Sequence, residues 1–271
     1  MSRVAGNVPY RVDLRNAGDD AFDRLVELGA LDAEHGHDGG IAALMPDSVT
    51  PEQVTSALGV DEISVSPAVG RDAGSVWVLR PRAIQVGRLR IVPPDTEGEP
   101  GALRMADSAA FGTGLHPTTA LCLEALDEAV QIARPDAVLD VGTGSGVLAL
   151  AALLLGVPTA LGIDIDDEAL RMAAENARIN ALDARLRLTR GGPDALTGTW
   201  PLVLANVLAA PLIEMAPVLV RRVGHTGQLV LSGIPTSVEQ DVDEAYRRLG
   251  MRRMGTKSRA GWVAIVLHAS W

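Results

Sequence analysis

The first seventy residues alternate apolar and polar positions in the order of a small α+β module. Two helices are expected. The first covers residues 21–28, after a pair of aspartates and before Gly29, and the second covers residues 51–58, with Thr50 as its N-cap. Four short stretches have the pattern of strands: residues 10–15, 30–34, 41–44 and 63–69. The resulting order, βαββαβ, predicts a ferredoxin-like module over residues 1–70.

A connecting region is expected next, from residue 71 to residue 101. It contains a hairpin-like pair of apolar stretches, residues 76–79 and 89–92. A loop rich in proline, glycine and acidic residues follows over residues 93–101 and has the composition of a linker. The region is therefore predicted to join two domains.

From residue 102 onward the pattern becomes a repetition of strand and helix. Helices are expected over residues 118–130, 147–155, 167–180, 211–223 and 237–249. Strands are expected over residues 137–141, 160–165, 185–188, 202–207, 228–234, 251–256 and 262–268. Apolar strands that alternate with helices are typical of a parallel sheet covered on both faces. The predicted fold class is α/β, with a seven-stranded Rossmann-like domain over residues 102–271 behind the small ferredoxin-like domain.

Composition narrows the class of protein. The chain of 271 residues is 47% apolar and 21% charged, as globular domains are, and only 3% aromatic, which argues against a protein that stacks bases on exposed rings. No apolar run is long enough to cross a bilayer and no export signal is visible, so a cytoplasmic location is expected. The single cysteine, Cys122, suits a reducing compartment.

Acidic residues concentrate in the predicted first module. The net charge is −10, and residues 1–70 hold twelve acidic residues against four arginines. An acidic face attracts basic partners and repels nucleic acid phosphates. A solvated surface without a specific partner is the alternative explanation.

Glycines follow the predicted strand 137–141 in the order Gly142-Thr-Gly144-Ser-Gly146. At the start of a helix, such residues let the backbone turn tightly and turn free N–H groups toward a ligand. A dinucleotide fold would place glycine where Val147 stands, so the pattern favours an adenosyl ligand without a pyrophosphate. A turn with only a structural role is the alternative.

Two polar side chains end neighbouring strands. Asp164 lies at the end of strand 160–165 and can accept the hydroxyls of a ribose, whereas Asp166 is expected to cap the following helix. Asn206 ends strand 202–207, where its amide oxygen could hold an amine, although a turn-forming asparagine is also possible. Ligands of open α/β sheets bind outside these strand ends.

Five stretches resemble the bacterial ribosomal protein L11 methyltransferase family (PrmA), in order and with the expected spacing, within a match from about residue 76 to the C-terminus. They are Phe111-Gly-Thr-Gly-Leu-His-Pro-Thr-Thr, Asp140-Val-Gly-Thr-Gly-Ser-Gly-Val-Leu-Ala, Gly162-Ile-Asp-Ile-Asp, Ala205-Asn-Val-Leu-Ala-Ala-Pro-Leu and Leu231-Ser-Gly-Ile. The resemblance implies a ferredoxin-like substrate-recognition domain joined to an S-adenosylmethionine-dependent methyltransferase domain. It also implies methylation of lysine and N-terminal amines of ribosomal protein L11, a basic protein that the acidic module would suit.

The resemblance also carries candidate residues over by position. Those for the cofactor are Phe111, Thr113, Thr119, Gly142, Gly144, Asp164 and Asn206, and Asn206 is the catalytic candidate. No metal site is expected, because His35 and His37 have ligand-like spacing but lack partners. His116 could relay a proton, although a packed or capping role is the simpler expectation.

The chain departs from the family pattern in three places. Residues 106–110 are Ala-Asp-Ser-Ala-Ala, where the family has a sequence similar to Asp-Pro-Gly-Met-Ala. Pro201 stands where the family usually has an aspartate. Only Trp77 remains of a tryptophan-rich, basic stretch that the family normally carries in the linker. Alternatives therefore stay open: a methyltransferase for another protein or a small amine, or a non-catalytic S-adenosylmethionine-binding protein. A nucleic acid methyltransferase is disfavoured, because Asn206 is not followed by two prolines and an aromatic residue.

Overall fold

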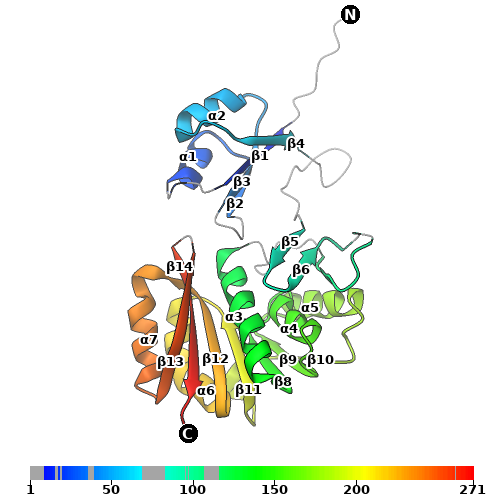
Figure 1. Cartoon of the computed structure of the whole chain (residues 1–271), viewed down its shortest axis with the longest axis vertical. Helices are drawn as coiled ribbons and strands as arrows, with labels where there is room; N and C mark the ends of the chain where they lie inside the picture. Colours follow the sequence, from blue (N-terminus) through cyan, green and yellow to red (C-terminus); the bar gives the residue numbers. More distant parts are fainter. Residues whose placement is uncertain are drawn as a thin grey trace, which may run out of the picture. The chain divides into compact units, whose positions relative to one another are not determined.

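The structure is a computed structural model that describes residues 9–15, 18, 20–35, 40–68, 83–94, 96, 98–106, 116–259 and 261–271. The chain divides into two compact units, Met1–Arg80 and Pro81–Trp271. Figure 1 shows the helices and strands that make up each unit.

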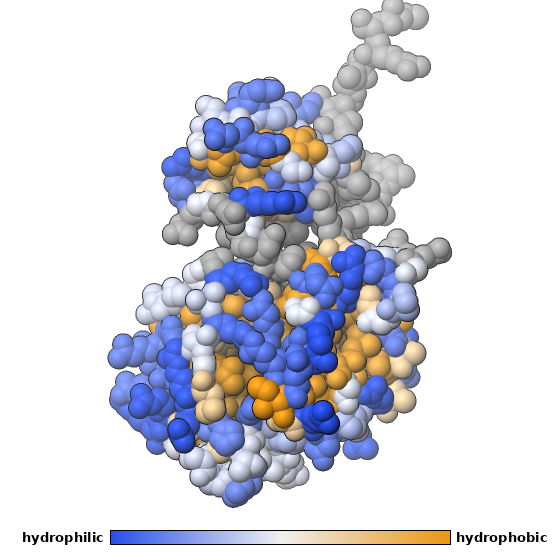
Figure 2. All heavy atoms as spheres, viewed as in Figure 1, coloured by the Kyte–Doolittle hydropathy of each residue, from blue (hydrophilic) through white to orange (hydrophobic). Residues whose placement is uncertain are grey.

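The first unit is a four-stranded antiparallel sheet with two helices. Its elements are β1 (Tyr10–Leu14), α1 (Ala21–Glu27), β2 (Asp32–His35), β3 (Ile41–Met45), α2 (Pro51–Leu58) and β4 (Ser64–Pro67). The strand order β2-β3-β1-β4 is that of the predicted ferredoxin-like module. Apolar residues of one sheet face pack against the helices, with Val12, Leu25, Met45 and Val54 fully buried. Hydrophilic residues predominate over the outer side of α1 and α2 (Figure 2).

Helix α2 begins where its sequence predicts. The Thr50 hydroxyl accepts from the Gln53 N–H at 3.3 Å, and the Gln53 side chain accepts from the Thr50 N–H at 2.7 Å. The helix ends at Gly59, whose φ of 67° lies in the left-handed region. Local capping therefore sets both ends of this helix.

A small sheet begins the described part of the second unit. It consists of β5 (Ile84–Val86), β6 (Leu89–Val92) and β7 (Leu103–Arg104), in the order β5-β6-β7. Residues 76–79, the expected hairpin partner of β6, lie outside the described residues, and β6 pairs with β5 instead. The alternate apolar residues of β5 and β6 are buried in the main core of the unit, so this stretch is part of a domain core.

The rest of the second unit is a doubly wound α/β domain. Its strands are β8 (Ala137–Val141), β9 (Thr159–Asp164), β10 (Leu186–Arg190), β11 (Trp200–Asn206), β12 (Val223–Pro235), β13 (Met251–Arg259) and β14 (Trp262–Ala269). The sheet order is β10-β9-β8-β11-β12-β14-β13, and all neighbours are parallel except those of β14. The helices are α3 (Pro117–Ala133), α4 (Val147–Leu154), α5 (Asp167–Ile179), α6 (Ala209–Arg222) and α7 (Glu239–Arg247), with 3-10 turns at Pro193–Ala195 and Thr236–Val238. The predicted seven-stranded sheet is confirmed.

Two apolar layers follow from the two-residue repeat of the strands. In β8, Val138 belongs to the core cluster that contains α3 and α4, whereas Leu139 and Val141 belong to the cluster that contains α6 and α7. Figure 1 shows these helix pairs on opposite faces of the sheet. Because both faces are covered, the central strands β8 and β11 are apolar over most of their length, and a polar residue within them needs a specific explanation.

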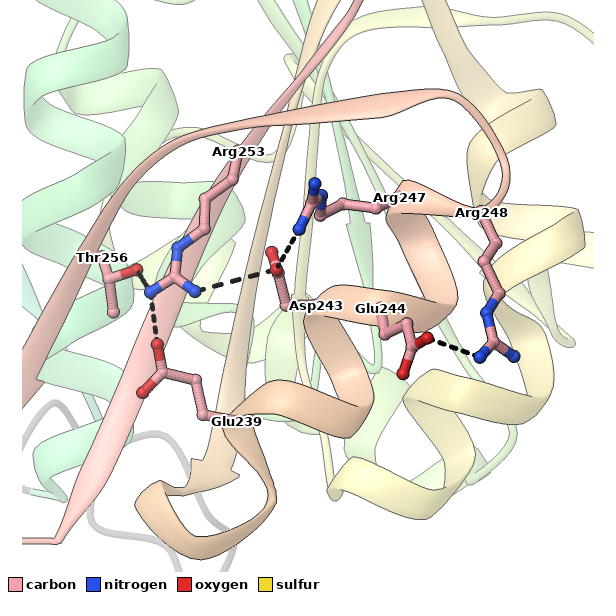
Figure 3. Close-up of polar contacts among 7 residues, drawn as sticks. All are labelled: Glu239, Asp243, Glu244, Arg247, Arg248, Arg253 and Thr256. Atoms are coloured by element: carbon pink, nitrogen blue, oxygen red, sulfur yellow. Dashed lines mark hydrogen bonds and ion pairs between the residues drawn. The ribbon is translucent and has the colours of Figure 1, made fainter.

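Polar contacts hold edge strand β13 to α7 (Figure 3). The Arg253 guanidinium lies between Glu239 and Asp243 and also contacts the Thr256 hydroxyl. Arg247 approaches Asp243 from the other side, at 3.8 Å. The edge strand is therefore fixed by charged side chains of a helix as well as by its pairing with β14.

Candidate cofactor site

Three strand ends meet where the strand order of the large sheet reverses. β8 lies between β9 and β11, with Val141 paired to Ile163 on one side and to Ala205 on the other. The segments that leave these strands therefore reach one edge of the sheet together. This edge is the expected ligand position in an open α/β fold.

The glycine-rich turn after β8 is held by backbone hydrogen bonds. The N–H groups of Gly142 and Thr143 both donate to the Ile163 carbonyl at 2.9 Å, and the Gly146 N–H donates to the Thr143 carbonyl at 2.8 Å. Gly142, Gly144 and Gly146 have φ values of 72°, 54° and 80°. L-residues with side chains rarely adopt such angles, so the chain path depends on these glycines.

Space explains Gly142 further. A Cβ atom at this position would stand 2.5 Å from Val207 Cγ1 on the neighbouring strand end. A Cβ atom at Gly233, at the end of β12, would collide with the backbone of Val207. The two glycines thus let three strand ends approach one another closely.

A buried carboxylate in β8 accepts hydrogen bonds from the turn and from α4. Asp140 is fully buried in β8, and its Oδ2 accepts from the Thr143 hydroxyl at 2.7 Å and from the Ala149 N–H at 3.2 Å. Its Oδ1 is buried with no partner among the described residues. Burial raises the pKa of Asp140 to about 6, a shift that the two hydrogen bonds oppose and the nearby Asp164 adds to. Asp140 was given no role from the sequence alone, although an aspartate inside an apolar strand was the available signal.

Asp164 lies beside the turn, half-buried, at the end of β9. Its Oδ2 accepts from the Gly144 N–H at 3.0 Å, and its Oδ1 accepts from the Asp166 N–H at 3.1 Å. Asp166 caps α5 by accepting from the Glu168 N–H at 2.9 Å, which confirms its predicted role. Each Asp164 oxygen keeps a further lone pair for a ligand hydroxyl.

Asn206 and Thr119 meet across 87 residues of sequence. The Asn206 amide donates to the Thr119 hydroxyl at 3.2 Å, and Thr119 is fully buried in the first turn of α3. No hydrogen bond of the Asn206 amide oxygen is found within the described ranges. Two residues that the resemblance singled out thus form one polar pair at the end of β11.

His116 has a structural role at the start of α3. Its Nδ1 accepts from the Thr118 N–H at 3.3 Å and lies 2.8 Å from the Thr118 hydroxyl. The ring also makes an edge contact with Trp262, at 5.2 Å between centroids. The capping and packing role expected as the simpler alternative is confirmed.

Two large apolar side chains are exposed directly after the polar strand ends. Ile165, next to Asp164, is 76% exposed, and Leu208, two residues after Asn206, is 67% exposed. Leu208 occupies the N-cap position of α6 without making a side-chain cap. Sequence reasoning missed both residues, although an isoleucine inside the acidic run 164–168 was a usable signal.

Several sequence predictions fall outside the described residues. Phe111 and Thr113 lie in the undescribed range 107–115, and His37 and the His35 side chain are likewise not described. Within the described part of the chain, no group of three or more histidine, cysteine, aspartate or glutamate residues could hold a metal ion. None of the helices described has the length and apolar composition needed to cross a membrane.

Comparison with known proteins gives one consistent family. Residues 78–270 match the family described as ribosomal protein L11 methyltransferase (PrmA). A protein of that name from Pelobacter propionicus is 37% identical over 217 residues, which are 77% of this chain and 70% of the relative. Another, from Geobacter sulfurreducens, is 43% identical over 67% of this chain and 61% of its own length.

A solved structure agrees with these sequences. The ribosomal protein L11 methylase from Lactobacillus delbrueckii subsp. bulgaricus has a TM-score of 0.64 and 28% identity. The match covers 70% of this chain and 98% of that one. The sequence relatives are matched over only part of their length, down to 61% for the Geobacter sulfurreducens protein.

Proposed function

The chain belongs to the ribosomal protein L11 methyltransferase (PrmA) family, and from this premise we propose that it methylates amines of a basic protein, with ribosomal protein L11 as the first candidate. The methyl donor is S-adenosylmethionine. The observation that carries the proposal is the meeting of the glycine turn, Asp164 and Asn206 at one edge of the sheet.

The residues present fit this donor. Val147 stands where the dinucleotide pattern Gly-x-Gly-x-x-Gly has its last glycine, and Asp164 offers carboxylate oxygens to ribose hydroxyls. The exposed Ile165 beside it provides an apolar surface for a flat ring. When bound, the donor supplies a methyl group on a positively charged sulfur.

The acceptor amine must be neutral and aligned. A lysine amine has a pKa near 10.4, so removing its proton at neutral pH costs about 4 kcal/mol. Desolvation at the edge of the sheet lowers this cost, since burial disfavours the ammonium form. The Asn206 amide nitrogen is held by Thr119, and its amide oxygen would accept one amine hydrogen and so orient the acceptor amine. Positioning supplies most of the rate enhancement.

The proton leaves to water. His116 lies three residues before Thr119, the partner of Asn206, but its Nδ1 is already engaged with the N–H and hydroxyl of Thr118. A base held in a helix cap cannot turn toward a substrate without breaking the cap.

Charge supports a basic protein as the substrate. The first unit exposes Asp23, Glu27, Asp61 and Glu62, whereas Arg11 and Arg24 are paired with Asp13 and Asp20. Exposed carboxylates attract a basic partner and raise its association rate at low salt. Lysine and N-terminal amines on such a partner are the proposed acceptors.

Labelling tests this proposal. The purified chain is incubated with methyl-labelled S-adenosylmethionine and unmodified ribosomal proteins from its own source, and the label is located by mass spectrometry. Label on L11 amines is the expected result. Label on another protein or a small amine would contradict the substrate. Donor binding without any labelling would contradict the enzymatic role.

A further inference from the structure

Asn176 in α5 and Asn180, the C-cap residue of the same helix, lie one turn apart and hold the backbone at the end of β7 and just beyond it. Asn180 accepts from the Arg104 N–H at 2.8 Å and donates to the Arg104 carbonyl at 2.6 Å. Asn176 accepts from the Ala106 N–H at 2.8 Å. Spacing by four residues places both amides on one face of the helix, as these hydrogen bonds require.

Asn176 makes a second contact that Asn180 does not make. Its amide donates to the Ser145 carbonyl at 2.9 Å, and Ser145 lies inside the glycine turn. Asn180 donates instead to Arg104 and to the Asn176 carbonyl at 2.7 Å. Asn176 is also fully buried, whereas Asn180 is half-buried. One amide therefore joins three segments that are distant in sequence.

The Ser145 contact helps to fix one peptide plane of the glycine turn. The Ser145 carbonyl and the Gly146 N–H belong to the same planar peptide group. The N–H is held by the Thr143 carbonyl at 2.8 Å and the carbonyl by Asn176. Gly146 is the N-cap of α4, has φ of 80°, and makes no side-chain cap. Pinning this peptide therefore sets the direction in which the turn enters α4.

Helix α5 also packs directly on the turn. A Cβ atom at Gly146 would lie 3.0 Å from the Ala173 Cβ, and Ala173 precedes Asn176 by one turn on the buried face of α5. The Gly144 N–H, the other side of the same turn, is held by Asp164. Asn176 and Asp164 thus hold two peptides of one loop from two different elements.

We propose that Asn176 is a positioning residue for the methyl donor, which sets the glycine turn in its binding geometry through the Ser145 carbonyl. The inference rests on the proposed site, because it assumes that the donor binds at this turn. Removing the amide would break the hydrogen bonds to the Ser145 carbonyl and from the Ala106 N–H, and the turn would shift to recover hydrogen bonds. Donor affinity would fall while the end of β11, where Asn206 lies, stays in place.

The sequence offers a matched control. Asn176→Ala and Asn180→Ala remove the same side chain, from α5 and from its C-cap, and each breaks a hydrogen bond to the backbone of residues 104–106. Only Asn176→Ala removes the contact with the turn. Both variants are therefore expected to lower the unfolding temperature, and only one is expected to change donor binding.

Calorimetric titration with S-adenosylmethionine separates the two variants. Asn176→Ala is expected to weaken binding about tenfold or more, with KM for the donor raised and kcat at saturating donor nearly unchanged. Asn180→Ala is expected to stay within about twofold of the wild type. Asn176→Ser, whose shorter side chain has one oxygen in place of the amide oxygen and nitrogen, is expected to fall between and provides a folded variant if Asn176→Ala does not fold.

Three outcomes would overturn the inference. If Asn176→Ala and Asn180→Ala weaken binding equally, Asn176 acts through general stability. If neither variant weakens binding but Asp164→Ala does, the turn binds the donor without help from Asn176 and the proposed site stands. If Asp164→Ala also leaves binding unchanged, the donor binds elsewhere and the proposed site fails as well.

Discussion

The two halves of the binding edge are built differently. On the β8–β9 half, the N–H groups of Gly142, Thr143, Gly144 and Gly146 each have an acceptor, and Asp164 is bonded twice. On the β11 half, the Asn206 side chain makes one hydrogen bond to the residues that the structure describes, at 3.2 Å. The glycine half is therefore ordered before any ligand binds, whereas the asparagine half keeps polar groups ready for one.

This difference matches two chemical tasks. A ligand that must be held in one orientation gains from a preformed loop, because little conformational entropy is lost on binding. An acceptor amine needs an oxygen that is not already satisfied. Mutations on the glycine half should therefore change affinity, and mutations on the asparagine half should change turnover.

The largest effect is expected from Gly142→Ala. The new methyl group would meet Val207 Cγ1, and alanine would be strained at φ of 72°. Donor affinity, measured by calorimetry, is expected to fall about a hundredfold or more. Gly156→Ala is the control, because Gly156 also has positive φ, at 104°, but lies in open space between α4 and β9. The Gly156→Ala variant should be less stable than the wild type but keep the wild-type affinity for the donor. An unchanged donor affinity in Gly142→Ala would refute the role of the turn.

Asp140→Asn tests how far the buried carboxyl of the glycine half lowers the stability of the fold as the pH rises. A carboxyl whose folded pKa of about 6 exceeds its ordinary value of about 3.9 is disfavoured as an anion in the folded state. The stabilisation from the protonated Asp140 carboxyl is fully present below about pH 4 and is lost as the pH rises through about 6. The loss in the free energy of unfolding is about 3 kcal/mol.

The asparagine variant lacks this titration. Its free energy of unfolding should therefore change less than that of the wild type between pH 4.5 and pH 7.5. Urea unfolding at both values measures the difference. Parallel pH dependence in the two proteins would show that Asp140 is not the buried titrating group.

Asp164→Ala tests whether Asp164, on the glycine half, binds the ribose of the donor. Loss of a charge-assisted ribose contact should weaken donor binding by about 1.5–3 kcal/mol. The matched control is Asp166→Ala, two residues away, which removes the α5 cap and should lower stability by about 0.5–2 kcal/mol. Equal affinities in Asp164→Ala and the wild type, by calorimetry, would exclude the ribose role.

Asn206→Ala tests the role of the asparagine half in turnover. Without the amide oxygen, the acceptor amine loses its orientation, so kcat should fall about tenfold or more while donor affinity changes little. Steady-state kinetics with saturating donor separates the two quantities. A variant with normal kcat would remove the distinction between the two halves.

The smallest effect is expected at the α7–β13 edge, far along the sheet from the binding edge. Arg253→Met removes the cation between Glu239 and Asp243 and should lower the free energy of unfolding by about 1 kcal/mol (Figure 3). Arg248→Met breaks an exposed pair with Glu244 and should cost about 0.3–0.5 kcal/mol. Both should keep wild-type donor affinity, and a change there would show that the site is not confined to the strand ends.

The parts of the site that were predictable from sequence depend on neighbouring residues. The glycine turn, the α5 cap at Asp166 and the α2 cap at Thr50 each follow from a few adjacent positions. Element boundaries were less accurate: α6 begins at Ala209 although residue 211 was expected, and the helix expected at 237–249 is α7, Glu239–Arg247. Helix ends fray over one or two residues, which local patterns do not resolve.

The sequence by itself determined the fold class, the strand ends that carry polar groups, and the backbone angles that only glycine permits, because these properties arise from side-chain period and local sterics. Only the tertiary structure decided that β6 pairs with β5, that Asp140 is buried with a raised pKa, and that Asn176 joins α5 to the glycine turn. These features depend on which distant groups surround each residue. Desolvation and side-chain hydrogen bonds are set by those neighbours, and no local pattern encodes them.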